Sequence, residues 1–204
     1  MTGKHSPSFV HPHALVETQE IGEGTRIWAF THVLAGAAIG RNCNIGDHCF
    51  IEGSVRVGDN VTIKNGSMLW DGVTIEDGVF IGPGAIFTND QYPRSPRLEE
   101  ARERYATRDW LVPTHVRHGA TIGAGATILA GTTIGRFALV AARALVTRDV
   151  PDHAVARGMP ARVSGWVCRC GWIVPEQPET ATCPECGLAF EQQNDGVVRW
   201  DEPA

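Results

Sequence analysis

Large apolar residues recur at every sixth position along much of the chain. Counting from residue 15, thirteen consecutive positions of this series carry one. They are Leu15, Ile21, Ile27, Val33, Ile39, Ile45, Ile51, Val57, Ile63, Leu69, Ile75, Ile81 and Phe87. After a break, the six-residue series resumes at Val116, Ile122, Ile128, Ile134, Val140 and Val146. Only about a quarter of residues in an average chain would qualify, so this fixed period predicts a solenoid of stacked coils.

Smaller residues stand two positions before most members of this series. They are Ala37, Cys43, Cys49, Val55, Val61, Ser67, Val73, Val79, Ala85, Ala120, Ala126, Thr132, Ala138 and Ala144. Because residues two apart share one face of a strand, we expect both sets to point inward. Gly, Asn or Asp often follows the large apolar residue, because a tight corner needs backbone angles that these residues adopt readily. The pattern predicts an all-β protein, a parallel β-helix whose coils of three hexads stack at about 4.8 Å. An α-helix is excluded, because residues six positions apart do not stay on one face of a helix with 3.6 residues per turn.

Residues 88–112 interrupt the six-residue repeat with the polar sequence TNDQYPRSPRLEEARERYATRDWLV. Loops longer than about 12–15 residues in a compact domain are uncommon and often functional. Since the repeat resumes beyond it, this insertion must leave the solenoid and return. Residues 97–106 are compatible with a short charged helix. We expect a functional site at this insertion.

Length and charge set the domain organisation and the expected location. The 204 residues suit one main domain with a small appendage: an extended or disordered start at 1–9, the β-helix at 10–165 and a tail at 166–204. No signal peptide and no apolar run of about 18 residues is present, so we expect a soluble cytoplasmic protein. The net charge of −5 disfavours nucleic acid as a partner. Thirteen of the sixteen arginines follow Pro93, which indicates either a local anion site or a solvated surface.

The tail contains two cysteine pairs, each followed by glycine. Cys168 and Cys170 form the first pair, and Cys183 and Cys186 the second. This spacing is typical of a zinc ribbon with four thiolate ligands, although the first pair has one intervening residue instead of two. Two disulfides are the alternative, which a reducing cytoplasm disfavours. The remaining cysteines, Cys43 and Cys49, fall in the inward phase and are expected in the core. The role of the acidic tail stays open.

Four stretches carry a resemblance to a known family: residues 27–40 (IWAFTHVLAGAAIG), 69–95 (LWDGVTIEDGVFIGPGAIFTNDQYPRS), 119–135 (GATIGAGATILAGTTIG) and 144–166 (ALVTRDVPDHAVARGMPARVSGW). With the repeats they cover nearly all of residues 10–166. The chain resembles the left-handed β-helix acyltransferases, most closely the N-acetyltransferases of nucleotide-linked 3-amino sugars. The resemblance implies a left-handed coil and a homotrimer. It also implies active sites between neighbouring prisms, with acetyl-coenzyme A near the C-terminal end.

For the sugar substrate, the resemblance points to the entrance of the insertion. In the similar enzymes the asparagine of the FTN sequence contacts the reacting amine, and this role carries over to Asn89. Asp90 is a candidate proton acceptor or sugar ligand, and Tyr92 and Arg94 suit a base or a pyrophosphate. The alternative is that Asn89 and Asp90 form only a turn and that 93–96 is a rigid exposed segment. The sequence leaves UDP and dTDP equally open, and the acyl group is itself inferred.

For coenzyme A, small residues near the C-terminal coils are the candidates. Main-chain groups around Ala124 and Ala142 are expected to hold the pantetheine arm. Arg162, and after it Arg143, are candidates for the phosphates, with plain solvation as the alternative for both. The alanines are also compatible with a role as corner fillers.

Two other functions remain in view at this stage. His115 and His118 are candidates for a general base, although their positions favour the outer face. A carbonic anhydrase of the same fold needs three histidines around a metal, and this pair does not resemble that ligand spacing. A scaffold with a zinc docking module is the third possibility, and it leaves the sequence FTNDQYPRS unexplained.

Overall fold

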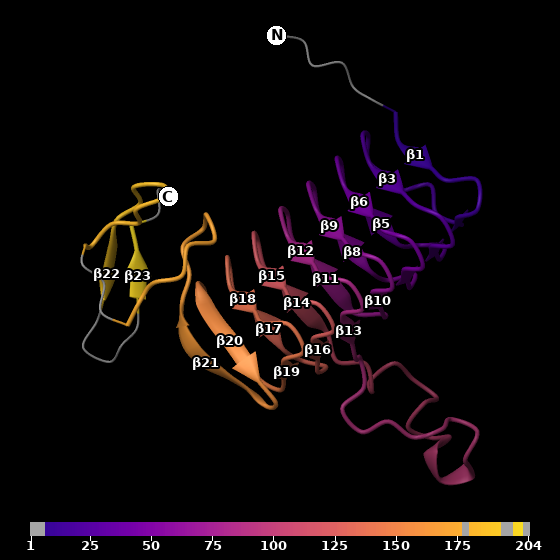
Figure 1. Cartoon of the computed structure of the whole chain (residues 1–204). Helices are drawn as coiled ribbons and strands as arrows, with labels where there is room; N and C mark the ends of the chain where they lie inside the picture. The colour runs from indigo at the N-terminus through magenta and orange to yellow at the C-terminus, as the bar shows by residue number, and fades with distance from the viewer. Residues whose placement is uncertain (1–6, 177–179, 193–197, 202–204) are drawn as a thin grey trace.

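The computed structural model describes residues 7–176, 180–192 and 198–201, and three parallel sheets form the faces of a triangular prism (Figure 1). The nine-stranded sheet contains β1 (Phe9–Val10), β3 (Arg26–Ile27), β6 (Asn44–Ile45), β9 (Thr62–Ile63), β12 (Phe80–Ile81), β15 (Thr121–Ile122), β18 (Leu139–Val140), β20 (Ala154–Gly158) and β21 (Ala161–Trp166). The seven-stranded sheet contains β2 (Leu15–Val16), β4 (His32–Val33), β7 (Phe50–Ile51), β10 (Met68–Leu69), β13 (Ile86–Phe87), β16 (Thr127–Ile128) and β19 (Leu145–Val146). The five-stranded sheet contains β5 (Ala38–Ile39), β8 (Arg56–Val57), β11 (Val73–Ile75), β14 (Thr114–Val116) and β17 (Thr133–Ile134).

Each coil passes through the three sheets in the same order. We call the turn from the nine- to the seven-stranded sheet corner I, the turn from the seven- to the five-stranded sheet corner II, and the turn back corner III. Equivalent residues of successive coils pair eighteen apart, as in the series Ile27, Ile45 and Ile63. Coils of three hexads are therefore confirmed, and so is the predicted parallel β-helix.

The predicted inward positions form one continuous core. From Ile27 to Val146 every large member of the series is at most 5% exposed, and the smaller residues two positions earlier are buried with them. Each fully buried Ile contributes roughly 1.5–3 kcal/mol. The prediction is wrong for Leu15, which is 56% exposed. Val16 takes the inward place and pairs with Val33, because the first coil is one residue short: these partners stand seventeen apart.

The corners need left-handed backbone conformations and close approach between coils. At corner I, positive φ occurs at Phe30, His48, Gly66, Gly84, Gly125 and Arg143. Gly123 stands two residues before Gly125, and a Cβ added to it would lie 2.4 Å from the amide nitrogen of Ala142 in the next coil. Only glycine lets the two coils stack there, because no side chain fits so close to backbone.

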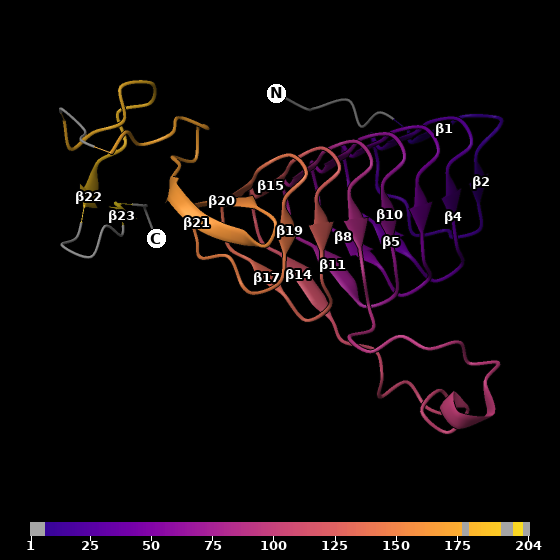
Figure 2. The same ribbon diagram turned by 60° about the horizontal axis from the view of Figure 1, so that its bottom comes forward.

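The insertion leaves the prism after β13 and returns at β14, as the sequence predicts, and it projects from corner II (Figures 1 and 2). The repeat resumes in register, since Val116 pairs with Ile75. The expected charged helix is wrong: residues 97–106 contain one turn of 3-10 helix, η1 (Glu99–Ala101), followed by turns. A segment of this length with no apolar face is too short to sustain an α-helix.

An antiparallel hairpin of β20 and β21 closes the C-terminal end of the prism, with Ala154 opposite Trp166. The tail beyond it contains two cysteine turns and the hairpin of β22 (Phe190–Gln192) and β23 (Val198–Trp200). Its own core consists of Val174, Phe190 and Val198. The first six residues of the predicted extended or disordered start lie outside the described residues. Among the helices of the described part, none is long and apolar enough to span a bilayer.

Candidate functional site

The entrance of the insertion places Asn89 at corner II, in the same coil to which the chain returns at β14. Asn89 is half-buried, and its carbonyl accepts a hydrogen bond from the amide of Val112 at 2.9 Å, which ties the two ends of the insertion together. Within the described part of the chain, the side-chain amide of Asn89 makes no hydrogen bond to another residue. A pinned backbone with a free amide suits a group that orients a ligand.

Asp90 is the centre of a polar cluster that holds the insertion in shape. Its carboxylate accepts hydrogen bonds from the Tyr105 hydroxyl at 2.7 Å, from the Tyr92 amide at 2.8 Å and from the Arg104 guanidinium. The Tyr105 hydroxyl also accepts a bond from the amide of Arg94 at 2.9 Å. We call Asp90, Arg104 and Tyr105 the loop latch. Sequence reasoning missed Arg104 and Tyr105, because fourteen and fifteen residues of irregular chain separate them from Asp90.

The loop latch also changes the chemistry of Asp90. Burial opposes ionisation of this carboxyl, but the hydrogen bonds from Tyr105, the Tyr92 amide and Arg104 outweigh it and lower the pKa of Asp90. A carboxylate with a lowered pKa is a weaker base. The geometry therefore favours a turn and anchor role for Asp90 over proton abstraction.

The other two residues expected at the substrate site lie on the outside of the insertion. Tyr92 is 71% exposed, and the guanidinium of Arg94 bonds the carbonyl of Pro93 at 2.9 Å. A second tie, from Arg108 to Asp71 at 2.6 Å, joins the far side of the insertion to the prism. Tyr92 and Arg94 thus sit beside Asn89 in sequence and face solvent in the single chain.

Three of the expected coenzyme residues come together at corner I. Ala124 and Ala142 occupy equivalent places in adjacent coils, and the amide of Arg143 donates to the Ala124 carbonyl at 2.8 Å. Arg143 is exposed and has a φ of 59°, at the place where Gly125 and Gly84 stand in earlier coils. Small side chains thus lie next to one another along this corner, with a cation at its C-terminal end.

Arg162 lies apart from these residues, on the closing hairpin. Its register partner in β20 is Arg157, so two arginines stand directly opposite one another in the hairpin. Like charges directly opposite in an antiparallel pair are destabilising, and a bound anion relieves that repulsion. This pairing results from the register of the hairpin, and the spacing of the two arginines in the sequence did not reveal it.

Within one chain, the two halves of the expected site are separated. Asn89 and the insertion belong to corner II, whereas Ala124, Ala142 and Arg143 belong to corner I. The seven-stranded sheet lies between these corners. The two sets of expected site residues therefore lie on different corners of one chain.

Among the described residues, the histidines do not form a group that could share a metal ion. His115 is exposed on β14, and the ring of His118 lies edge-on to Phe137 with centroids 5.2 Å apart. His32 bonds Glu17 at 2.9 Å, and His48 stacks on Phe30. In the described residues, the only group of three or more His, Cys, Asp or Glu side chains close enough to share a metal is made of cysteines.

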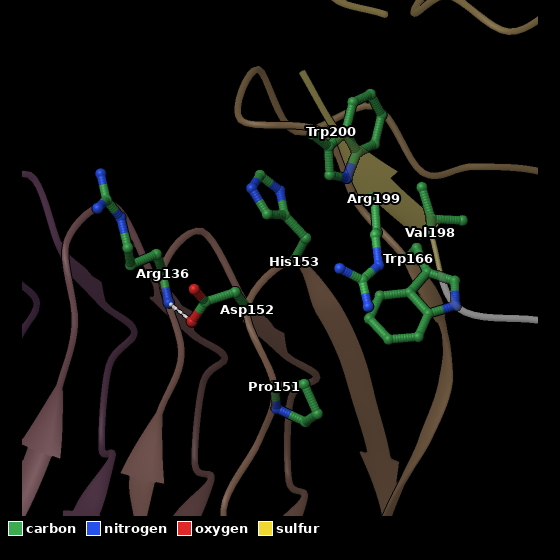
Figure 3. A pocket seen from close by; sticks show the side chains of 8 residues that line it. All are labelled: Arg136, Pro151, Asp152, His153, Trp166, Val198, Arg199 and Trp200. Atoms are coloured by element: carbon green, nitrogen blue, oxygen red, sulfur yellow. Dashed lines mark hydrogen bonds between the residues drawn. The ribbon is translucent and has the colours of Figure 1, made fainter. Parts of the chain in front are cut away.

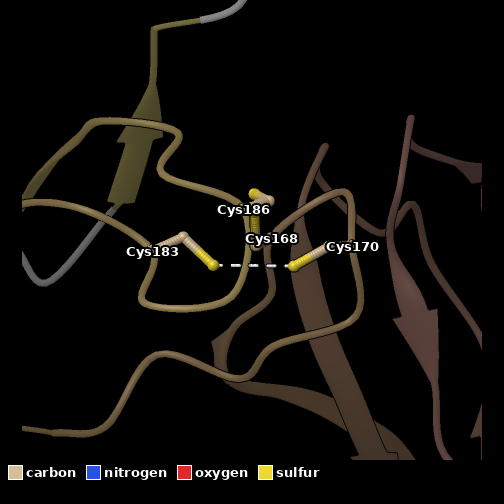
Figure 4. Close-up of side chains that lie close together, drawn as sticks. All are labelled: Cys168, Cys170, Cys183 and Cys186. Carbon is tan, nitrogen blue, oxygen red and sulfur yellow. Dashed lines mark hydrogen bonds between the residues drawn. The ribbon is translucent and has the colours of Figure 1, made fainter.

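That group is Cys168, Cys170, Cys183 and Cys186, whose sulfurs all lie within 4.8 Å of one another (Figure 4). The Sγ atoms of Cys168 and Cys186 are 3.4 Å apart, and those of Cys170 and Cys183 are 3.5 Å apart. Tetrahedral zinc with bonds of about 2.3 Å separates its sulfurs by roughly 3.8 Å, so the four thiols fit such an ion. None of the six cysteines forms a disulfide.

The two cysteine turns have similar geometry despite their different spacing. The Gly171 amide donates to the Cys168 carbonyl and the Gly187 amide to the Cys183 carbonyl, both at 2.8 Å. Both glycines have positive φ. The Leu188 amide and the neighbouring thiols lower the pKa of Cys186 to about 7, whereas burial raises the pKa of Cys168. The Cys186 thiol thus loses its proton more readily than an ordinary cysteine, as a zinc ligand must.

Comparison with protein families identifies the class. The family model for bacterial transferase hexapeptide repeats matches residues 20–53 and 54–89, and the hexapeptide repeat of succinyl-transferase matches 113–148. These matches stop at the insertion and resume after it, as the coils do. The chain belongs to the hexapeptide-repeat acyltransferases, which confirms the resemblance stated from the sequence.

A full-length relative narrows the comparison. The chain is 49% identical over 198 residues to the dTDP-3-amino-3,6-dideoxy-alpha-D-galactopyranose 3-N-acetyltransferase of Aneurinibacillus thermoaerophilus, and the match covers 97% of each chain. Among solved structures, a hexapeptide-repeat acetyltransferase of Vibrio cholerae in complex with acetyl coenzyme A is 30% identical, with a TM-score of 0.51 over 64% of this chain and 70% of that one. The acetyltransferase domain of PglB from Neisseria gonorrhoeae shares the fold: TM-score 0.51, 21% identity, 79% of this chain and 60% of that one.

Proposed function

We propose that this enzyme transfers the acetyl group of acetyl-coenzyme A to the 3-amino group of a dTDP-linked 3-amino-3,6-dideoxyhexose. The observation that carries the proposal is the match to the Aneurinibacillus enzyme, which spans the insertion and the tail as well as the coils. The general repeat is common to many acyltransferases, whereas the insertion is the part that departs from it. The sequence alone left UDP and dTDP open, and the name of this relative favours dTDP.

Acetyl-coenzyme A is the donor in this proposal. The Vibrio structure, at 30% identity, holds acetyl coenzyme A on the same fold. We assign the pantetheine arm to the path along corner I, where Ala124 and Ala142 leave room beside the backbone. Arg143 and Arg162 then meet the phosphates, since guanidinium groups make paired hydrogen bonds to phosphate oxygens.

The chemistry asks little of the protein beyond positioning. A neutral amine attacks the thioester carbonyl, an oxyanion develops, and the departing thiolate takes up a proton. Asn89 is our candidate for orienting the amine, because its side-chain amide is unoccupied on a backbone fixed by Val112. We assign Tyr92 and Arg94 to the nucleotide part of the substrate, since an aromatic ring suits a base and a guanidinium suits a pyrophosphate. The loop latch holds these residues in place, and we assign no side-chain base.

A homotrimer would join the two half-sites. The outward residues of the seven-stranded sheet are largely apolar: Leu15, Phe50, Met68, Ile86 and Leu145. Those of the five-stranded sheet are mostly polar: Arg56, Thr74, His115 and Thr133. Three of the apolar residues are more than 40% exposed in the single chain. Such a patch is typical of an interface, and covering it with a neighbouring prism brings corner II of one chain toward corner I of the next.

We further propose that the four tail cysteines bind one structural zinc ion. The tail core of three residues is too small to hold a fold by itself, and zinc coordination supplies the missing free energy. We expect a cytoplasmic location for this enzyme, where a reducing environment keeps thiols available to a metal. In this proposal the zinc takes no part in acetyl transfer.

The test of the activity is a substrate panel with the purified enzyme. Release of free thiol from acetyl-coenzyme A is measured with dTDP- and UDP-linked 3-amino sugars, and with a dTDP sugar that has a hydroxyl at C3 as the matched control. We expect turnover on the dTDP amine, weaker turnover on the UDP amine and none on the alcohol. Absence of turnover on every amine would refute the proposed activity.

A further inference from the structure

A cavity of about 470 Å³ lies where the tail meets corner III of the prism (Figure 3). Its walls come from three separate parts of the chain. The prism contributes Arg136, Asp152 and His153, β21 contributes Trp166, and β23 contributes Arg199 and Trp200. A volume of this size accommodates a small ligand, and junctions between structural units are frequent sites of binding. This cavity exists only because the tail packs against the prism.

Hydrogen-bond donors outnumber acceptors in this cavity. The indole nitrogen of Trp200 is buried and has no partner within the described residues. The guanidinium groups of Arg136 and Arg199 also make no ion pair there. Among the described wall residues, the one carboxylate is that of Asp152, which accepts a bond from the Arg136 amide at 2.7 Å. Glu191 stands opposite Arg199 in the hairpin register but does not line the cavity.

A buried donor without a partner costs free energy that an acceptor on a ligand recovers. Two guanidinium groups among the wall residues favour a ligand with anionic oxygens, since guanidinium groups match phosphate geometry. The donor set therefore indicates a phosphate or a similar anion. These donors recognise the anionic group and leave the rest of the ligand unspecified.

Aromatic rings define the remainder of the cavity. His153 stacks on Phe137 with centroids 5.2 Å apart and lies 5.6 Å from Trp200 at 35°. Its Nδ1 is 2.9 Å from the carbonyl of Val167, so this ring is fixed. In Figure 3, Trp166 and Trp200 flank Arg199 on the side of the cavity that faces His153. The His153 ring is therefore already covered by Phe137 and Trp200, and Trp200 also packs on Phe190 with centroids 5.0 Å apart. The parts of the Trp166 and Trp200 indoles that line the cavity are the ring surfaces left for a planar ligand, since indole faces bind planar rings by stacking.

We propose that this cavity is a nucleotide-binding site, with the phosphate on Arg136 and Arg199 and the base against the indoles. It lies at corner III and is distinct from corners I and II, where we place the coenzyme and the amino sugar. The proposal does not depend on the proposed activity. Two sources share this chemistry: the phosphorylated adenosine of coenzyme A and a thymidine nucleotide.

Titration of the purified full-length chain distinguishes these sources. The probes are adenosine 3′,5′-bisphosphate, dTDP and inorganic phosphate. Binding is followed by quenching of tryptophan fluorescence and by the NMR signal of the Trp200 indole proton, which the Trp200→Phe variant assigns. We expect saturable binding of at least one nucleotide, a shift of that indole signal, and binding of phosphate at least about tenfold weaker.

Two variants localise the binding. Arg199→Ala should weaken nucleotide binding about tenfold or more, since it removes a charge-assisted contact. Trp200→Phe keeps a ring but removes the donor and should weaken binding by about fivefold. The matched controls are Arg117→Ala and Trp28→Phe on the prism, outside the cavity, and both should bind as the parent does. Arg199→Lys should restore part of the affinity.

The proposal is overturned by any of three results: no saturable binding of either nucleotide, equal affinity for nucleotide and phosphate, or binding that survives both cavity variants. If adenosine 3′,5′-bisphosphate binding falls only in Arg162→Ala, that probe reports the coenzyme site and the cavity assignment fails for it. These readouts are independent of turnover, so an enzyme without acetyltransferase activity would still test the site.

Discussion

The coils of the prism and the segments that depart from the repeat are stabilised in different ways. In the prism, one continuous apolar cluster extends from Ile27 to Ala161. In the described part of the tail, the buried cluster contains Val174, Phe190 and Val198, beside four cysteines. The insertion is held by the loop latch and by ties to the prism. A repeating core therefore makes the coils robust, whereas the departing segments depend on a few polar or thiolate contacts that a single substitution removes.

The largest contrast is expected for two buried cysteines. Cys183→Ala should abolish zinc binding and unfold the tail, because structural zinc sites contribute about 10–16 kcal/mol of apparent binding free energy. Cys49→Ala, the control, removes an equally buried thiol from the prism core and should leave about one zinc per chain. Metal analysis and tail proteolysis measure the difference. An unchanged zinc content in Cys183→Ala would contradict the assignment of the ligands.

A substitution in the prism core should lower stability without affecting zinc binding. Ile63 is fully buried, so Ile63→Ala leaves a cavity and should lower the free energy of unfolding by about 2–5 kcal/mol. Denaturant unfolding followed by circular dichroism gives this value. Zinc content should remain that of the parent, and a loss of zinc together with the coils would show that tail and prism fold as one unit.

The insertion separates activity from stability. Asn89→Ala should reduce turnover at least about tenfold with little change in unfolding, since Asn89 lies outside the core. Asn44→Ala on the outward side of β6 is the matched control and should keep its activity. Steady-state kinetics and the oligomeric state are measured together. Full activity in Asn89→Ala would remove this residue from the mechanism.

The smallest effect is expected at the loop latch, and it depends on pH. The pKa of Asp90 is lower in the folded chain than in the unfolded one, so its stabilisation is present above the ordinary aspartate pKa of about 3.9. This stabilisation is lost as the pH falls through the lowered value. At neutral pH, Asp90→Asn should speed tryptic cleavage within residues 97–104 about fivefold, equivalent to roughly 1 kcal/mol.

Asp109→Asn is the control for this experiment, because Asp109 is exposed and contacts only Thr107 nearby. Its cleavage rate should equal that of the parent. In the acid range, pepsin should open the parent insertion progressively, whereas the Asp90→Asn variant should show no such pH dependence. Equal cleavage of both variants at neutral pH would argue against the latch.

Much of the fold followed from the six-residue pattern, and the exceptions have local causes. Leu15 was misplaced because one missing residue in the first coil shifts the inward phase to Val16. The charged helix failed because local propensity over ten residues does not outweigh the entropy of nucleation without packing. The cysteine set was predictable from spacing, since each pair sits on its own short turn.

The sequence by itself determined the stacked coils, the location of the insertion and the grouping of the cysteines, because each depends on contacts between residues at fixed, short separations. Only the tertiary structure decided that the coenzyme and insertion residues occupy different corners, that Tyr105 and Arg104 engage Asp90, and that the tail forms a cavity against corner III. Those contacts join irregular segments whose paths no period sets, so their partners become visible only when the chain is folded.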